Sequence, residues 1–189
     1  MQRPRMTSPS WAPRLAIAIA PLLVTACGPR GLLSFELGYD VAEQRVEGSP
    51  LGGLLGNVVD VPIPLDVDLA AETASRDTGP AQHVYLTELR LDITPTDEPA
   101  GDTDDFDFLD SVEIYVESAQ SGSSLPRQRV AALEAVPRGA RTIRLTPDDV
   151  DLIAYVQEGA RLTSSASGRV PPDDVTFTGH LTLVVEVLP

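Results

Sequence analysis

The sequence predicts an all-β fold, a single antiparallel β-sandwich of about seven strands with one short helix. The first observation is the alternation of apolar and polar residues in 59–69, 84–93 and 175–187. Such alternation is typical of strands with one face on a core and one in water. The second is that turn-forming residues separate these segments, as in sandwiches. The third is that only one segment has a helical pattern, whereas parallel sheets need crossover helices.

The segment 59–69 predicts a strand at the edge of a sheet. Its apolar residues occupy every second position, and Pro62 and Pro64 lie between them. Proline has no N–H group to donate to a neighbouring strand. Both proline side chains point the same way, so the missing donors lie along one side. Prolines at such an edge also discourage edge-to-edge aggregation.

The remaining strands are predicted at 84–93, 112–116, 129–133, 142–145 and 175–187. The signal at 129–133 and 142–145 is weaker because these segments are short. Gly179 stands in the apolar row of the last segment. A glycine inside a strand pattern predicts a bulge or a close approach of another backbone.

The single predicted helix begins at Thr146 and ends at Gly159. Thr146 is suited to cap the first turn, Pro147 suits the first helical position, and two acidic residues follow. The segment 48–56 holds four glycines and one proline. These residues oppose a regular helix, so we expect a loop there, as for most of the chain after Tyr39.

Composition excludes several classes of function. The chain has 189 residues and a formal net charge of −14, and all of its 14 Lys and Arg residues are arginine. An acidic body repels phosphate backbones, which argues against nucleic-acid binding, and favours cations or basic partners. The single cysteine excludes an intramolecular disulfide and a thiolate zinc site.

The N-terminus has the pattern of a secretory signal peptide. Residues 1–14 are basic and polar, and 15–24 are apolar except for Pro21. This apolar stretch is shorter than the roughly 20 residues that span a bilayer. We therefore expect cleavage of this segment.

The residues at the expected cleavage site suggest a lipid anchor. Leu23-Val24-Thr25-Ala26-Cys27 resembles the lipobox of bacterial lipoproteins, with Val24 where leucine is commonest. The resemblance implies a thioether-linked diacylglycerol on Cys27 and a cut before it. It divides the chain into a signal peptide (1–26), a lipidated tether (27–33) and a sandwich domain (34–189). Gly28 favours the outer over the inner membrane, since aspartate there retains enteric lipoproteins in the inner one.

The loop 97–110 is rich in aspartate and suggests a calcium site. Calcium takes six to eight oxygen ligands in flexible geometry, and the candidate ligands are Asp102, Asp104, Asp105 and Asp107. The spacing does not fit an EF-hand, because Asp107 stands where that loop needs glycine. The alternative is a solvated connector pinned to the core by Phe106 and Phe108.

Other chemistry has weaker signals. His180 lies on the polar face of the last strand and His83 opens another, so both are expected to be structural. The acid pairs Asp173-Asp174 and Asp148-Asp149 suit a turn and a helix start. A basic strip could meet anionic lipid, an acidic partner or the aspartate-rich loop; it consists of Arg127, Arg129, Arg138, Arg141 and Arg144.

These observations predict a membrane-anchored envelope lipoprotein that is not an enzyme and docks an unidentified envelope protein. One alternative is a calcium-dependent adhesion or carbohydrate-binding module that uses the 97–110 loop. Another is a hydrolase that uses two carboxylates, which would need a cleft and a raised pKa. No cofactor is expected apart from possible calcium.

Overall fold

The structure is a computed structural model that describes residues 32–49, 54–55, 63–65, 69–96 and 103–188. The strands in these ranges are β1 (Leu33–Val46), β2 (Leu54–Leu55), β3 (Ile63–Leu65), β4 (Ala81–Thr94), β5 (Leu109–Ser118), β6 (Gln128–Leu133), β7 (Thr142–Pro147), β8 (Ala160–Arg169) and β9 (Val175–Val187). The helices are α1 (Leu69–Ser75) and α2 (Ile153–Gln157).

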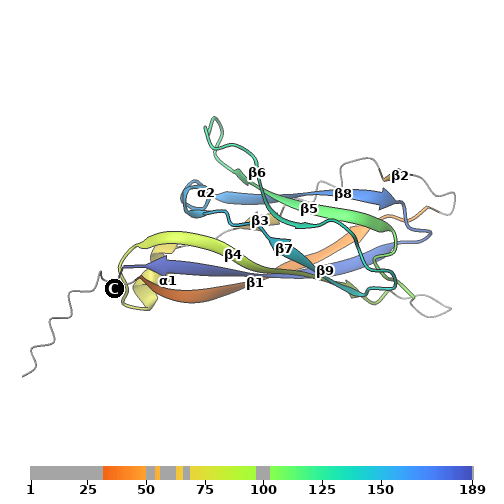
Figure 1. Ribbon diagram of the computed structural model, residues 1–189, viewed down its shortest axis with the longest axis horizontal. Coiled ribbons are helices and arrows are strands. Elements are labelled where there is room, and N and C mark those ends of the chain that lie inside the picture. Colours follow the sequence, from red (N-terminus) through yellow and green to blue (C-terminus); the bar gives the residue numbers. More distant parts are fainter. Residues whose placement is uncertain (1–31, 50–53, 56–62, 66–68, 97–102, 189) are drawn as a thin grey trace, which may run out of the picture.

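The strands pair antiparallel in the order β1-β9-β4-β7-β6-β5-β8-β2, and β3 also pairs with β8. The strand β7 pairs with β4 up to Leu145 and with β6 through Thr146 and Pro147, so the sheet folds over along β7. Figure 1 shows the resulting two layers, with β1, β9 and β4 below and β5 and β8 above. The predicted all-β antiparallel sandwich is confirmed.

Alternating side chains fill the space between the layers. Five hydrophobic residues of β9 are buried, namely Val175, Leu181, Leu183, Val185 and Val187, and Leu89, Leu91 and Ile93 of β4 are buried as predicted. Gly179 lies between β1 and β4, where an added Cβ would stand 3.1 Å from Val41 Cβ and 3.1 Å from Leu91 Cδ2. Gly179 is thus closely approached by side chains rather than by another backbone, and the register of β1 shifts directly after its partner Val41.

The prediction for 59–69 is confirmed over part of its length. Residues 63–65 form β3, which pairs only with β8 at the outer edge of its layer. Residues 59–62 and 66–68 lie outside the described residues. The strand prediction is wrong at Leu69, where α1 begins. Sequence analysis did not predict this helix.

The prediction of a helix from Thr146 is wrong. Thr146 and Pro147 complete β7, and the N–H of Asp148 continues the pairing by donating to the Val130 carbonyl at 2.8 Å. The N–H of Leu152 then donates to the Val84 carbonyl at 2.7 Å. These tertiary hydrogen bonds outweigh the local capping signal, so the helix begins only at Ile153.

Three strands, β1, β2 and β8, were not predicted, and β1 and β2 correct the loop expected after Tyr39 and over 48–56. In β1 the register shifts between Val41 and Gln44, which breaks the alternation that identifies a strand. In β8 the middle residues are small and mostly hydroxylated, so apolar and polar positions do not alternate. Since β1 begins at Leu33, the last residue assigned to the tether already belongs to the sheet.

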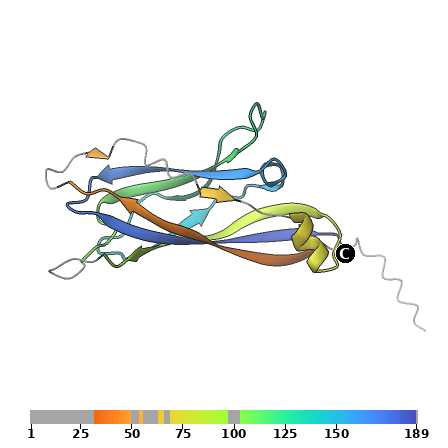
Figure 2. The same ribbon diagram turned by 180° about the vertical axis from the view of Figure 1, so that it is seen from behind.

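The two ends of the sandwich differ in what they gather. Leu33 pairs with Val187, so the start of β1 and the end of β9 lie at the same end, which we call the terminal end. Figure 2 shows α1 beside the start of β1 at this end. Val46 pairs with Val175 at the opposite end, which we call the loop end. The 14 residues of β1 separate the two ends by about 45 Å at a rise of ~3.4 Å per residue.

Candidate functional site

The terminal end carries an apolar patch of three leucines. Leu32, Leu33 and Leu188 expose 41%, 51% and 41% of their surfaces and are the large exposed hydrophobic residues within the described ranges. The pairing of Leu33 with Val187 brings both chain ends together, and the N–H of Gly79 donates to the Leu188 carbonyl at 2.9 Å. The leucine patch, defined by these three residues, therefore lies where the described chain begins and ends.

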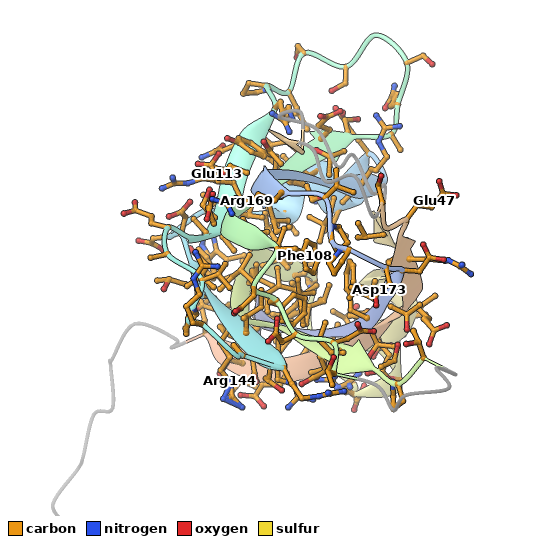
Figure 3. All side chains as sticks on the ribbon, turned by 90° about the vertical axis from the view of Figure 1, so that its right-hand side faces the viewer. Glu47, Phe108, Glu113, Arg144, Arg169 and Asp173 are labelled. Carbon is orange, nitrogen blue, oxygen red and sulfur yellow. The ribbon has the colours of Figure 1, made fainter. Side chains whose placement is uncertain are left out.

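The loop end contains an acidic cavity of about 330 Å³. Its carboxylates come from the loop before β5 and from the loop before β9, and they are Asp104, Asp105, Asp107 and Asp173. Arg169 and Phe108 also line the cavity. Figure 3 views this end and shows Phe108 between Arg169 and Asp173. The fold thus gathers part of the acidic loop and the Asp173-Asp174 pair at one end.

Each described aspartate of the acidic loop has a hydrogen bond within the protein. The buried carboxylate of Asp104 accepts from Thr96 Oγ1 at 3.1 Å, and Asp105 Oδ1 accepts from the Asp107 N–H at 2.8 Å. Asp107 Oδ1 accepts from the Gly139 N–H at 2.5 Å. These bonds fix the conformation of the loop and its contact with the turn before β7.

The calcium hypothesis stays a prediction. Among the described residues no group of three or more His, Cys, Asp or Glu side chains could hold a metal ion. Asp102, the first of the four candidate ligands, lies outside the described residues. The other three carboxylates accept hydrogen bonds from separate donors, which gives each of them a structural role.

The aromatic pins expected in this loop are confirmed. Phe106 is fully buried and Phe108 is 8% exposed. The Phe106 ring packs 6.2 Å from the Phe108 ring and 6.1 Å from the Phe177 ring, between centroids. The Phe106 N–H also donates to the Ala140 carbonyl at 2.9 Å. The loop is therefore attached to the core by its aromatic residues.

A second cavity of about 430 Å³ adjoins the first through Asp173, which lines both. Asp174 also lines this second cavity. Its carboxylate accepts a hydrogen bond from the Gly48 N–H at 2.8 Å and forms an ion pair with Arg45. The Gly48 hydrogen bond, followed by that from Arg45, lowers the pKa of the Asp174 carboxyl below its ordinary value. Asp174 therefore joins the end of β1 to the start of β9.

Both histidines contact aspartates. His180 Nδ1 of β9 lies 2.7 Å from Asp40 Oδ1 of β1, which confirms the expected structural position between strands. His83 Nδ1 lies 2.7 Å from Asp151 Oδ2, and Asp151 Oδ1 accepts from the N–H groups of Val84 and Ile153 at 3.1 and 3.0 Å. Partial burial raises the pKa of Asp151, but these three hydrogen bonds outweigh it, so the pKa lies below its ordinary value.

Asp151 has a structural role that the sequence did not reveal. It ties the start of β4 to the segment that leads into α2, and Tyr85 forms an isolated β-bridge with Asp151. The only sequence signal was an aspartate shortly before an apolar helical pattern. That pattern fits a helix cap as well as a tertiary contact.

The predicted basic strip is neutralised within the protein. Arg127 pairs with Glu117 at 2.8 Å, and its guanidinium lies 3.7 Å from the centroid of the Tyr115 ring. Three further arginines of the strip form ion pairs: Arg129 with Glu113 and Asp148, Arg138 with Asp110, and Arg144 with Glu88. Arg138 also donates to the Asp107 carbonyl at 2.8 Å. The expected contact with the aspartate-rich loop is thus confirmed for Arg138, whereas Arg127, Arg129 and Arg144 pair with carboxylates outside that loop.

Neither helix in the described part of the chain is long and apolar enough to cross a bilayer. No family model matches the sequence. No curated protein matches it either.

Three solved structures of viral proteins resemble the fold at low scores. The decameric BFDV capsid protein has 13% identity and a TM-score of 0.44, and the match covers 84% of this chain and 99% of that one. Mud crab tombus-like virus has 8% identity and a TM-score of 0.30, with coverages of 97% and 94%. Desmodium yellow mottle tymovirus has 10% identity and a TM-score of 0.25, with coverages of 98% and 98%. These values support no statement about function.

Proposed function

We propose that the protein is a bacterial envelope lipoprotein, anchored through acylated Cys27, whose sandwich docks a protein partner and catalyses no reaction. The observation that carries the anchor is the coincidence of two features. The lipobox-like residues 23–27 precede the domain, and the leucine patch lies at the end where the described chain begins.

The distance along the chain links the two features. Five residues separate Cys27 from Leu32, a reach of at most about 18 Å. A lipid on Cys27 would therefore keep the terminal end near the membrane surface, where exposed leucines are favourable. A diacylglycerol supplies the two acyl chains that stable anchoring requires. The loop end would then be free to face away from the membrane.

The pKa shifts support a non-catalytic role. A carboxyl that acts as a general acid near neutral pH needs a raised pKa. Asp151, Glu158 and Asp174 each have a pKa lowered below the ordinary value, the opposite direction. Their hydrogen bonds to backbone N–H groups, Ser123, His83 and Arg45 explain this direction. The hydrolase alternative gains no support from these carboxyls.

The anchor is tested by expressing the full chain in a bacterium that processes lipoproteins. We expect mass spectrometry to find a mature chain that begins at Cys27 with a diacylglycerol on Sγ, and fractionation to place it with membranes. Cys27→Ser should abolish the modification and release the protein from the membrane fraction. A wild-type protein with an unmodified cysteine, or an intact residue 1–26 segment, would overturn the proposal.

The choice of membrane is tested separately. We propose the outer membrane, because Gly28 follows the cysteine. Density-gradient separation of the two membranes should find the wild type with the outer membrane, and Gly28→Asp should move it toward the inner one in an enteric host. Equal distribution of both chains would contradict the outer-membrane assignment and leave the lipid anchor intact.

A further inference from the structure

The strand β1 lies at the edge of its sheet, and its outer side pairs with no other described strand. Within the described ranges β1 pairs only with β9, whereas β8, at the other end of the strand order, is covered by β2 and β3. No proline lies within residues 33–46. An edge strand of this length presents N–H and C=O groups that another strand can pair with.

The side chains of β1 alternate between the core and solvent up to Val41, where the register shifts and Ala42 and Glu43 are both exposed. Leu37 and Val41 are buried against the opposite layer, while Glu36, Asp40 and Glu43 are exposed. The Asp40 side chain is 90% exposed although it contacts His180. The solvent face of this edge is therefore acidic along most of its length.

The nearby cations already have partners. Arg45, the single basic residue of β1, pairs with Asp174. On the neighbouring strand β9, His180 contacts Asp40, and Glu186 adds a further acid opposite Ser34. Among the described residues no ion pair to Glu36 or Glu43 is observed, so the negative charge of these two side chains is not compensated within the protein.

This charge pattern decides the kind of strand that fits. If a second copy paired its β1 antiparallel about Gly38, Glu36 of each copy would face Asp40 of the other. Like charges directly opposite each other destabilise a strand pair, whereas opposite charges stabilise it. The chain also contains no lysine, so another copy could offer little basic charge from its own β1.

We propose that the open edge of β1 binds an extended segment of a partner protein that carries Lys or Arg at alternate positions. Main-chain hydrogen bonds to β1 supply most of the affinity, and pairing with Glu36, Asp40 and Glu43 supplies the selectivity. This inference identifies the docking surface of the proposed function and rests on the non-catalytic, partner-binding part of it. The edge runs from the terminal end toward the loop end.

The test uses the full chain as isolated from its host, in mild detergent, and a peptide of about ten residues with alternating Lys and Thr, a typical strand length. We expect saturable binding by calorimetry and slower hydrogen exchange of amides in 33–46. The control peptide has the same sequence with N-methyl groups on alternate amides. It keeps the charge but cannot extend the sheet, so it should bind far more weakly.

The acidic side chains are tested with a double variant, Glu36→Gln with Glu43→Gln. Loss of two favourable cross-strand pairs should weaken peptide binding by about threefold to tenfold. The matched control, Glu134→Gln with Asp149→Asn, removes the same charge from exposed positions outside β1 and should change binding by less than twofold. Equal effects of the two variants would overturn the proposal and leave only general attraction to an acidic protein.

Three other results would also overturn it, namely equal binding of the N-methylated peptide, no binding of either peptide, or dimerisation of the protein through β1. These experiments can refute the proposed lipid anchor and the proposed binding edge independently of each other. An unlipidated protein that binds the peptide refutes only the anchor, and a lipidated protein that does not bind refutes only the edge.

Discussion

The terminal end and the loop end of the sandwich are built from the same strands but expose opposite chemistry. The terminal end exposes leucines and also carries α1. The loop end buries Phe106 and Phe108 and surrounds them with carboxylates. A buried aromatic residue stabilises the fold, whereas an exposed leucine contributes little to it. The difference fits the proposed anchor, which would bring the exposed leucines to the membrane surface.

The largest expected effect tests this difference directly. Phe106→Ala should lower the free energy of unfolding by about 3–5 kcal/mol, because it leaves a cavity where a fully buried ring packed. Leu188→Ala, at the exposed terminal end, should change it by under about 0.5 kcal/mol. Urea denaturation of both variants measures the contrast. A loss at Leu188 as large as that at Phe106 would show that the leucine patch is structural.

A slightly smaller effect is expected at Gly168, where the loop end leaves no room. Gly168 has a φ of +154°, and an added Cβ would lie 2.1 Å from the Phe108 carbonyl oxygen. Gly168→Ala should therefore cost about 2–4 kcal/mol from backbone strain and displacement of the Phe108 segment. Gly122 also has a positive φ, of +81°, but no atom lies within 4 Å of its added Cβ.

Gly122→Ala is thus the matched control, because it isolates the cost of the backbone angle. We expect it to cost about 1 kcal/mol. Denaturation curves that give the two variants the same free energy of unfolding would show that the backbone at Gly168 relaxes without strain.

Asp151 allows a test of how the terminal half of the molecule responds to pH. Its pKa is lowered in the folded state, so it contributes stability above its unfolded pKa, near 4, and loses it as the pH falls through the lower folded value. At neutral pH Asp151→Asn should be about 1 kcal/mol less stable than the wild type, through loss of the charged contact with His83.

The difference between the two proteins should close as the pH falls from about 5 to about 2. Thermal unfolding at several pH values measures it, with Asp149→Asn as a control at an exposed neighbour. A constant difference over this range would mean that the contact between His83 and Asp151 does not depend on the charge of the carboxyl.

The strands of the sandwich show what could and could not be predicted from the sequence. In β9 the buried residues of the apolar row follow a period of two, and Leu181, Leu183, Val185 and Val187 were predicted from it. In β4 the predicted residues Leu89, Leu91 and Ile93 are buried, but the register shift between Leu86 and Glu88 places the buried Val84 and Leu86 in the other phase. The strand β8 was missed because its inward positions include Thr163, which is 5% exposed. A buried hydroxyl residue gives no hydrophobic signal, and its burial depends on partners from other strands.

The candidate sites show a similar limit. The residues of the acidic loop were evident, but their hydrogen bonds to Thr96 and Gly139 arise from tertiary contacts. The helix at Thr146 failed for the same reason, since local capping signals compete with pairing to β6. The edge position of β1 depends on strand order, and strand order cannot be read from the presence of strands alone. The lipobox-like pattern at 23–27 is local, so the anchor was predicted without tertiary information and stays a prediction.

The smallest expected effect is that of calcium on the loop end. A ligand that binds only the folded protein raises its stability by RT ln(1 + [L]/Kd), about 2.7 kcal/mol at a hundredfold excess over Kd. Among the described residues no group of three or more His, Cys, Asp or Glu side chains could hold a metal ion, so the three described candidate ligands do not form a site. We therefore expect millimolar calcium to leave the midpoint of thermal unfolding of the full chain unchanged relative to a chelator. A rise of several degrees that is lost when Asp102, Asp104 and Asp107 become asparagine would instead establish a calcium site. Because Asp173, in the loop before β9, lines the same cavity, such a site would connect this loop to the loop before β5, and the loop end would become the ligand-binding end of the molecule.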